Sequence, residues 1–288
     1  MTAAADTFEA CRPRMYGVAY GMLGDRGEAE DVVQDAWLRF ADADVDSLRS
    51  AEAFLVTVTT RLAIDRLRSA RVRRETYVGP WLPEPIVADL TQPDPSDVVA
   101  EAEQLSLALL VALERLNPVE RAVFLLRDVF DLDYTEIADV VEKTPANCRQ
   151  IAARAREHVG EPARRNPVSP EEEERILTAF FAASAAGDLE GLTAVLAHDA
   201  ILYSDGGGVV SAARKPIYGA AKCARFFVGI RRKLGYDPEY RLVRVNGEPG
   251  VHIQGPDGVA SVIAFEIADG MVANVRIVNN PHKLTRVT

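Results

Sequence analysis

The chain has 288 residues, carries a formal net charge of −10 and is 48% hydrophobic. This length exceeds one ordinary compact domain and fits two or three, each large enough to bury a core. The sequence has no run of eighteen apolar residues and no basic start followed by an apolar stretch, so we expect a cytoplasmic protein without a membrane span or leader. Its three cysteines are odd in number and widely spaced, which argues against a disulfide framework or a zinc site.

Residues 1–75 are predicted to form a first helical domain. Within residues 28–40, four apolar side chains recur at i, i+3, i+4 and i+7, the spacing of one helix face. The other face is mostly acidic with a hydrophobic end, and consists of Asp31, Gln34, Asp35 and Leu38. It is either solvated surface or a docking face for a basic partner helix.

A further helix is expected over residues 51–74, and its second half is strongly basic. Arg61, Asp65 and Arg68 have the spacing of an intrahelical salt-bridge ladder, which is worth a few tenths of a kcal/mol per pair. Residues 61–75 contain six arginines against one aspartate and one glutamate, so these acids cannot pair them all. Such an excess in a negatively charged chain favours a polyanionic partner.

Residues 76–104 break the helical pattern and are predicted to form an acidic, proline-rich linker. Five prolines between positions 80 and 95 exclude long helices, and no basic residue occurs from Trp81 to the end of the segment. Trp81 and Leu82 are too apolar for a solvated linker. We expect Trp81 to be docked onto a domain, because an exposed indole leaves a large apolar surface in water.

Residues 105–165 are predicted to form a compact helical domain that contains a helix-turn-helix. Asn117, Pro118 and Glu120 form a helix-start signal, which predicts a helix to residue 130. A second signal at Asp133 opens the first helix of the motif, and Thr144 caps its basic second helix. The N-terminal residues of such a second helix reach base edges in the major groove.

The candidate DNA contacts lie on this second helix. Arginine suits guanine and asparagine or glutamine suits adenine, so the base-reading candidates are Asn147, Arg149, Gln150 and Arg154. Phosphate contacts are expected from Arg156, Arg164 and Arg165, which would fix position without reading sequence. Cys148 is expected to pack under the helix.

The sequence pattern changes after residue 165, and residues 166–288 are predicted to form an α+β domain. Helices are expected over residues 170–186, 189–197 and 216–234, and strands over residues 201–205, 240–246, 251–254, 260–267 and 271–278. Asn-Gly and Asp-Gly pairs between the later strands are hairpin signals. The pattern predicts a curved antiparallel sheet covered by helices, a cone that usually encloses a pocket.

Several motifs resemble one protein family. Residues 27–38, GEAEDVVQDAWL, are similar to the polymerase-binding helix of sigma domain 2, and residues 116–121, LNPVER, with 134–138, YTEIA, are similar to sigma domain 4. Residues 8 to about 160 thus resemble the extracytoplasmic-function (ECF) sigma factors, bacterial subunits that direct RNA polymerase to promoters. Where many members have a Val-Lys-Ser-Arg run, this chain has Cys148 to Ile151. No promoter sequence is therefore carried over.

Three further motifs resemble the SigJ-like subgroup, which carries a C-terminal SnoaL-like domain. They are WLPEP at residues 81–85, DGGG at 205–208 and NPHKL at 280–284. The subgroup usually has aspartate where His282 stands, so the role of this position stays open. The resemblance implies two all-α sigma domains and a SnoaL-like cone that regulates them in cis.

The resemblance also implies roles for residues. The face around Asp31 would bind polymerase, and the helix bearing Arg61, Asp65, Arg66 and Arg68 would engage the downstream promoter element. The helix-turn-helix would read the upstream element. Contacts that hold the linker are expected from Trp81, Pro83, Asp205, Gly206, Gly207, Gly208, Asn280, Pro281, Lys283 and Leu284.

Catalysis by the C-terminal domain is the weaker alternative. Its candidate polar groups are Tyr203, Asp205, His198, His252 and Arg276, but no pair has the spacing of a recognised catalytic motif. The glycines at 206–208 fit turns or close packing better than a phosphate loop, because no Lys-Ser or Lys-Thr follows. We therefore expect no catalytic residue, no metal and no cofactor. A small-molecule ligand in the cone, and a ligand-sensing DNA-binding regulator that acts without polymerase, both stay open.

Overall fold

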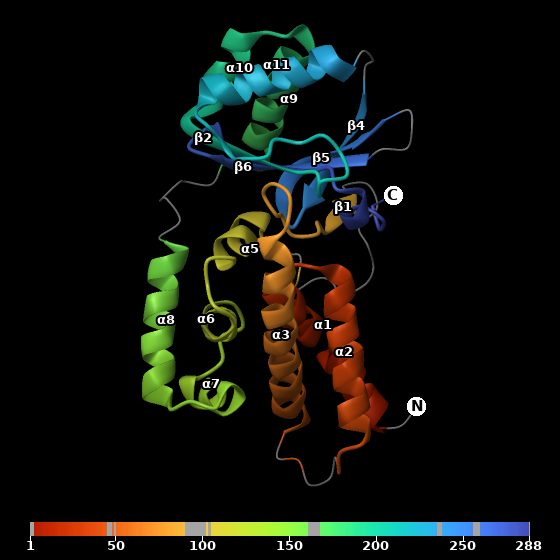
Figure 1. The fold of residues 1–288 in the computed structure, drawn as a ribbon, viewed down its shortest axis with the longest axis vertical. Coiled ribbons are helices and arrows are strands. Elements are labelled where there is room, and N and C mark those ends of the chain that lie inside the picture. Colours follow the sequence, from red (N-terminus) through yellow and green to blue (C-terminus); the bar gives the residue numbers. More distant parts are fainter. Residues whose placement is uncertain are drawn as a thin grey trace. The chain divides into compact units, whose positions relative to one another are not determined.

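The structure is a computed structural model that describes residues 3–44, 48, 50–89, 102, 105–160, 168–234, 238–255 and 260–287 (Figure 1). The chain divides into two compact units: Met1–Thr76 with Pro95–Pro162, and Tyr77–Asp94 with Ala163–Thr288. Arg164, Arg165 and most of the acidic half of the linker lie outside the described residues. No helix in the described ranges is long and apolar enough to cross a membrane.

The first unit begins with three helices, α1 (Ala3–Leu23), α2 (Arg26–Ala41) and α3 (Ala51–Glu75). The side chain of Asp25 caps α2 by accepting a hydrogen bond from the backbone N–H of Glu28, and Ser50 caps α3 in the same way. Val33, Ala36 and Phe40 are buried, as the apolar stripe of α2 predicts. The acidic and basic faces therefore point away from the core of these helices.

The second part of this unit contains α5 (Leu107–Leu113), α6 (Pro118–Phe124), α7 (Tyr134–Val141) and α8 (Pro145–Val159). Capping boxes open α6 and α7 as predicted. The predicted helix over residues 118–130 does not continue as an α-helix, because residues Leu125–Val129 form a π-helical turn, η2. The backbone N–H of Phe130 donates to the carbonyl of Leu125 at 3.0 Å, five residues back.

The helices of residues 3–75 and of residues 105–159 pack against each other within the first unit. Gly21 of α1 lies so close to Leu105 and Leu125 that a Cβ atom there would stand 3.1 Å from both side chains. Arg14 donates a hydrogen bond to the carbonyl of Phe130 at 2.8 Å. The two helical parts are therefore in direct contact.

The second unit is a seven-stranded sheet with helices over one face (Figure 1). Its helices are α9 (Pro170–Ala186), α10 (Leu189–Val195), α11 (Ala220–Leu234) and the short η3 (Pro281–Lys283). Its strands are β1 (Val87–Asp89), β2 (Leu196–Asp205), β3 (Ile217–Tyr218), β4 (Glu239–Val245), β5 (Glu248–Gln254), β6 (Ala260–Ala268) and β7 (Met271–Val278). The strand order is β1-β4-β5-β6-β7-β2-β3.

The sheet corrects three predictions. It is mixed rather than antiparallel, because β2 pairs with β7 in parallel, although β4 to β7 do form an antiparallel meander. Strand β2 starts at Leu196, five residues before the predicted start. The predicted helix over residues 216–234 begins only at Ala220, since Ile217–Tyr218 pair with β2 and Gly219 adopts a φ of +91°. These differences arise from pairing with distant strands, which local patterns do not encode.

The linker also contributes to this unit. Residues Val87–Asp89 form β1, which pairs with β4 at residues Val243–Val245 and becomes one edge of the sheet. The backbone N–H of Ile86 donates to the side chain of Asn246 at 3.0 Å. The linker is thus extended, as predicted, but its first half belongs to the C-terminal unit.

An aromatic core fills the space between the helices and the sheet. Phe180 of α9 lies 4.8 Å from Phe227 of α11 and 5.2 Å from Phe265 of β6, centroid to centroid, in edge-to-face contact. Leu202, Val251 and other buried residues complete this cluster. This cluster is the hydrophobic core between the helices and the sheet of the second unit.

Candidate nucleic-acid interface and linker anchor

The predicted DNA contacts lie on the outer side of α8. Arg149, Gln150, Arg154 and Arg156 are exposed and Asn147 is partly exposed, whereas Cys148 is fully buried. Thr144 caps the helix, accepting a hydrogen bond from the backbone N–H of Asn147. Burial raises the pKa of the Cys148 thiol, which makes it a poor redox switch. Cys148 therefore packs under the helix, as expected.

Some arginines of α8 are already held by neighbours in the same domain. The guanidinium of Arg149 lies 5.3 Å from the ring centroid of Tyr134, and Arg127 lies 5.2 Å from it. Arg156 donates two hydrogen bonds to Asp128, at 2.6 and 3.0 Å. Arg154 has no ion pair within the described part of the chain. These contacts fix the position of the exposed side chains without burying them.

The arginines of α3 pair with carboxylates of the first unit, but most pairs lie at the surface. Arg66 contacts Asp31 at 3.2 Å, Arg68 contacts Asp65 at 2.8 Å and Arg73 contacts Glu28. The side chains of Arg68 and Arg73 remain 60% exposed. Surface pairs contribute little, about 0–1 kcal/mol each, so these arginines can exchange their partners for phosphates.

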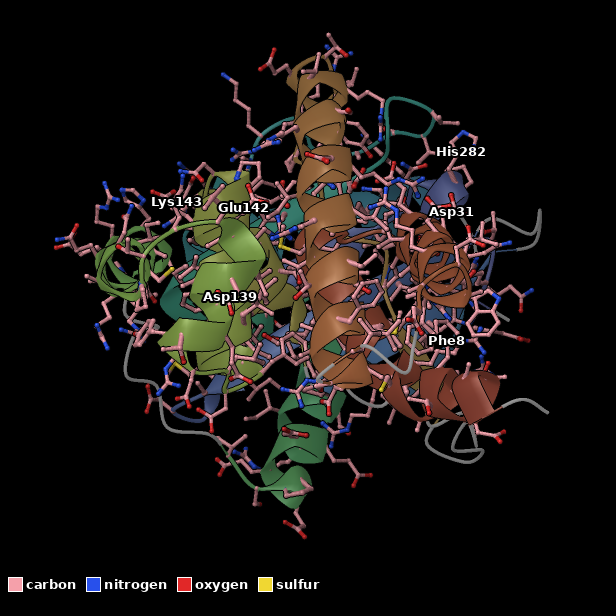
Figure 2. All side chains as sticks on the ribbon, turned by 90° about the horizontal axis from the view of Figure 1, so that it is seen from below. Phe8, Asp31, Asp139, Glu142, Lys143 and His282 are labelled. Carbon is pink, nitrogen blue, oxygen red and sulfur yellow. The ribbon has the colours of Figure 1, made fainter. Side chains whose placement is uncertain are left out.

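Arg61 connects α3 to the first helix of the helix-turn-helix. Its Nε donates to the carbonyl of Val140 at 2.9 Å and its Nη2 to the carbonyl of Asp139 at 2.7 Å. It also contacts the carboxylate of Glu142 at 3.3 Å. Figure 2 shows Asp139, Glu142 and Lys143 together at this end of α7. Arg61, a predicted DNA-contacting residue, thus connects the helices of residues 3–75 to those of residues 105–159.

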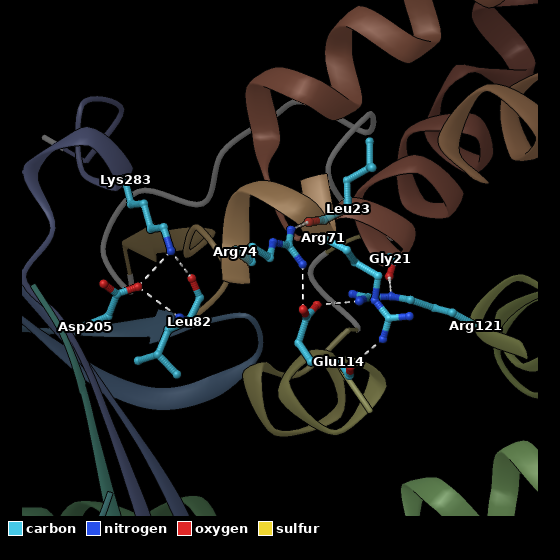
Figure 3. Close-up of polar contacts among 9 residues, drawn as sticks. All are labelled: Gly21, Leu23, Arg71, Arg74, Leu82, Glu114, Arg121, Asp205 and Lys283. Carbon is cyan, nitrogen blue, oxygen red and sulfur yellow. Dashed lines mark hydrogen bonds and ion pairs between the residues drawn. The ribbon is translucent and has the colours of Figure 1, made fainter. Parts of the chain in front are cut away.

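A buried ionic cluster joins the same parts more firmly (Figure 3). Glu114, at the end of α5, accepts hydrogen bonds from Arg121 of α6 and from Arg74 of α3. Arg121 is only 1% exposed, and its Nε donates to the carbonyl of Gly21 in α1. Burial favours a raised pKa for Glu114, but the two arginines outweigh it and the pKa is lowered. This cluster was not predicted, because it requires residues from four helices.

The predicted polymerase-binding face is exposed on α2. Asp31 and Gln34 are exposed, Asp35 is partly exposed, and Leu38 is 56% exposed at the end of the face. Figure 2 shows Asp31 on the outside of this helix. Arg66 reaches Asp31 at 3.2 Å and Asp35 at 3.8 Å, so it balances part of their charge. An exposed leucine within an acidic face is suited to a partner that is basic and partly apolar.

In the second unit, Asp205 holds the linker (Figure 3). This fully buried carboxylate accepts hydrogen bonds from the backbone N–H of Leu82 at 2.9 Å and from the hydroxyl of Tyr77. Lys283 pairs with it at 2.7 Å, donates to the carbonyl of Leu82 and lies 4.3 Å from the ring centroid of Trp81. Three motifs predicted to act together therefore meet at one buried ion pair.

The glycines and the C-terminal motif support this anchor. Gly207 has a φ of +61°, and a Cβ atom there would lie 2.4 Å from the side-chain nitrogen of Asn280. Gly208 packs against Val78, where a Cβ atom would stand 3.2 Å from its side chain. Asn280 donates to the hydroxyl of Tyr77 at 2.9 Å. The glycines are close-packing residues, as predicted, while Tyr77 is a contact that the motifs did not reveal.

The other predicted regulatory residues divide by exposure. Pro83 and Leu284 are buried, and Pro281 opens η3 at the surface. The side chain of His282 is exposed, and its backbone N–H donates to Asn280 at 3.1 Å. The histidine in place of aspartate therefore leaves the ion pair of Lys283 untouched.

The polar groups considered for catalysis contact different partners in the structure. His198 is exposed near the start of β2, and Asp205 is engaged by the linker. His252 of β5 lies beside Arg241 of β4, and burial together with Arg241 lowers its pKa. Arg276 and Tyr203 are neighbours on β7 and β2, and Arg276 pairs with Glu266 at 2.8 Å.

The comparisons with known proteins agree with this architecture. Residues 7–73 match the model of Sigma-70 region 2, and residues 106–159 match that of Sigma-70, region 4. The ECF RNA polymerase sigma factor SigJ of Mycobacterium tuberculosis is 37% identical, with 96% of this chain and 92% of the relative covered. The probable ECF sigma factor SigI of the same species is 32% identical, with 96% and 93% covered.

A solved structure extends the similarity to the whole fold. The crystal structure of M. tuberculosis SigJ matches with a TM-score of 0.79 and 35% identity over 98% of each chain. Helices, linker and C-terminal sheet are thus all shared with that protein. The chain belongs to the ECF RNA polymerase sigma factors, and it resembles SigJ in carrying a C-terminal α+β domain.

Proposed function

We propose that this protein is an alternative sigma factor that binds core RNA polymerase, directs promoter recognition and acts without catalysis of its own. The observation that carries the proposal is the basic, exposed face of α8 within an acidic chain whose two helical parts match sigma regions 2 and 4. Arg149, Gln150 and Arg154 would read the upstream element. The acidic face of α2, with Leu38, would bind the polymerase.

The contact between α3 and α7 represents, in this proposal, a closed resting conformation of the sigma factor, in which its two helical parts are joined. Arg61 is a candidate for the downstream promoter element, yet here it bonds to the carbonyls of Asp139 and Val140. The two helical parts must separate before each reaches its own promoter element. The pair with Glu142 is half-exposed, so charged DNA or polymerase can replace it.

The C-terminal domain is proposed to regulate the sigma factor in cis through the linker. The anchor of Asp205 and Lys283 holds residues 77–89 and thereby shortens the free chain between the two sigma parts. A shorter free tether limits how far they can separate. Release of the anchor would lengthen the tether and change promoter use.

The test is a pull-down on core polymerase followed by runoff transcription with the full chain. We expect co-purification with polymerase, weak binding of the isolated chain to duplex DNA, and transcription that changes when residues 280–288 are deleted. His282→Asp is the matched control, because this side chain is exposed, and it should leave transcription unchanged. Tight specific DNA binding without polymerase would instead support a regulator that acts alone.

A further inference from the structure

The helix α11 of the second unit is basic along its length, and Figure 1 shows it in the helical layer over the sheet. It contains three arginines, two lysines and no acidic residue, in a chain whose net charge is −10. With 3.6 residues per turn, the exposed basic residues fall on one face of the helix, and they are Lys222, Arg225, Arg232 and Lys233. The opposite face, which includes Phe227, is buried in the core.

These four basic side chains have no carboxylate partner among the residues that the structure describes. Other exposed arginines of the chain do have one: Arg68 of α3 pairs with Asp65, and Arg175 of α9 pairs with Glu172. Because an acidic chain offers many carboxylates, a basic face that is left without them is available to a partner outside the chain.

The stability of the helix explains only part of this charge. The basic residues of the last turn, Arg231 to Lys233, interact favourably with the negative end of the helix dipole. Lys222 lies in the first turn, where the same dipole is unfavourable to positive charge, and Arg225 lies in the second, where the dipole has little effect. A partner therefore accounts for these two positions better than the helix itself does.

The basic face is open along its length. Gly229 lies between the two pairs of basic residues, and a Cβ atom there would meet nothing within 4 Å. At about 1.5 Å per residue, the stretch from Lys222 to Lys233 is about 16 Å long, which is the rise of about five base pairs of duplex DNA at about 3.4 Å each. No large hydrophobic side chain is exposed on α11, all of which is described. Since protein interfaces centre on such side chains and are depleted in lysine, a nucleic acid fits this face better than a folded protein.

We propose that the basic face of α11 binds the phosphate backbone of duplex DNA. Contacts of arginine and lysine to phosphates fix position without reading bases, so this contact is independent of sequence and gains affinity from the release of counterions. It gives the second unit a DNA-contacting helix of its own, in addition to α3 and α8 of the first unit. That the DNA is a promoter held by polymerase rests on the proposed function, whereas the binding of duplex DNA does not.

The experiment is a titration of a fluorescein-labelled duplex of random sequence with the full chain, followed by anisotropy at salt concentrations from about 50 to about 200 mM. The double variant Arg225→Gln/Arg232→Gln removes two of the proposed phosphate contacts. We expect its plot of log affinity against log salt to be shallower than that of the parent by about two, and its affinity at the lowest salt to fall about tenfold or more. Glutamine is a good helix former, so the melting temperature should not change.

The matched control is Arg12→Gln/Arg175→Gln, which removes the same charge from two arginines that each pair with a glutamate three residues earlier. It should leave the affinity for the duplex and its salt dependence close to those of the parent. Poly-glutamate with the same label tests for an acidic protein partner. The α11 variant should change the binding of poly-glutamate no more than the control variant does.

Three results would overturn the proposal. They are equal effects of the two double variants on duplex binding, a loss of poly-glutamate binding as large as the loss of duplex binding, and no binding of the duplex by the parent at the lowest salt. Co-purification with core polymerase is scored separately. Its failure would contradict the proposed function and leave the binding of DNA by α11 standing.

Discussion

Each unit of this chain contains a carboxylate that is shared by several partners, but the two carboxylates differ in burial and in what they hold. Glu114 retains 24% side-chain exposure and is shared by Arg74 and Arg121, which join four helices of the first unit. Asp205 is fully buried and is met by Lys283 and the backbone of Leu82, so it holds a linker to a sheet. The first cluster joins the two helical parts whose separation we propose, and the second holds the linker between them.

This contrast suggests a division of roles. In the first unit, the buried cluster is accompanied by surface contacts such as Arg61 to α7, which are individually weak. In the second unit, the anchor combines charge, backbone bonds and aromatic contact at one point. The C-terminal unit is therefore expected to hold the linker more tightly than the sigma parts hold each other.

The largest effect is expected when the linker anchor loses its carboxylate. Asp205→Ala leaves Lys283 buried without its charged partner, which should cost about 3–5 kcal/mol. Urea unfolding of the Trp37→Phe protein, followed by Trp81 fluorescence, measures this, because the two tryptophans lie in different units. Glu174→Ala, at an exposed position of α9, is the control and should change the midpoint little. If the anchor contributed nothing to stability, Asp205→Ala and Glu174→Ala would unfold at the same urea concentration.

An intermediate effect is expected at Glu114, and it should depend on pH. Glu114→Gln deprives the buried Arg121 of a charged partner and should cost about 2–3 kcal/mol, part of which the amide recovers as a hydrogen-bond acceptor. The folded-state pKa of Glu114 lies below its usual 4.5, so its stabilising contribution is complete above that pH and is lost as the pH falls through the lowered value.

The measurement for Glu114 is unfolding of the first unit at several pH values. Trp37 fluorescence in a Trp81→Phe background should show that the variant loses less stability than the parent when the pH falls from 5 to 3. Glu157→Gln, at an exposed position of α8, serves as the control and should keep the acid sensitivity of the parent. Parallel curves for Glu114→Gln and the parent would contradict the role assigned to this carboxylate.

Local sequence signals predicted much of this molecule. The capping residues Asn117 and Thr144 predicted where α6 and α8 begin, and the apolar stripe predicted α2. These signals can be read from the sequence because each acts over only a few residues. The motifs around Asp205 and Lys283 also led to the linker anchor, since their resemblance to one subgroup grouped them. Sequence did not reveal the parallel pairing of β2 with β7 or the cluster around Arg121, because both depend on partners far apart in the chain.

The smallest effect is expected at the contact between Arg61 and α7. Glu142→Ala removes the carboxylate beside Arg61 but leaves the carbonyls of Asp139 and Val140, so the closed form should lose at most about 1 kcal/mol. Spin labels on cysteines at the exposed positions Ala53 of α3 and Ala153 of α8 report separation of the two parts.

The control for this last change is Glu157→Ala, an exposed residue of α8 that no described ion pair involves. We expect a larger long-distance population for Glu142→Ala than for the control, and a difference that shrinks as salt rises, because exposed charge pairs are screened. An unchanged distance distribution would mean that Arg61 is held by the carbonyls alone. Opening would then depend on breaking backbone-directed hydrogen bonds, and the acidic residue beside them would have no part in it.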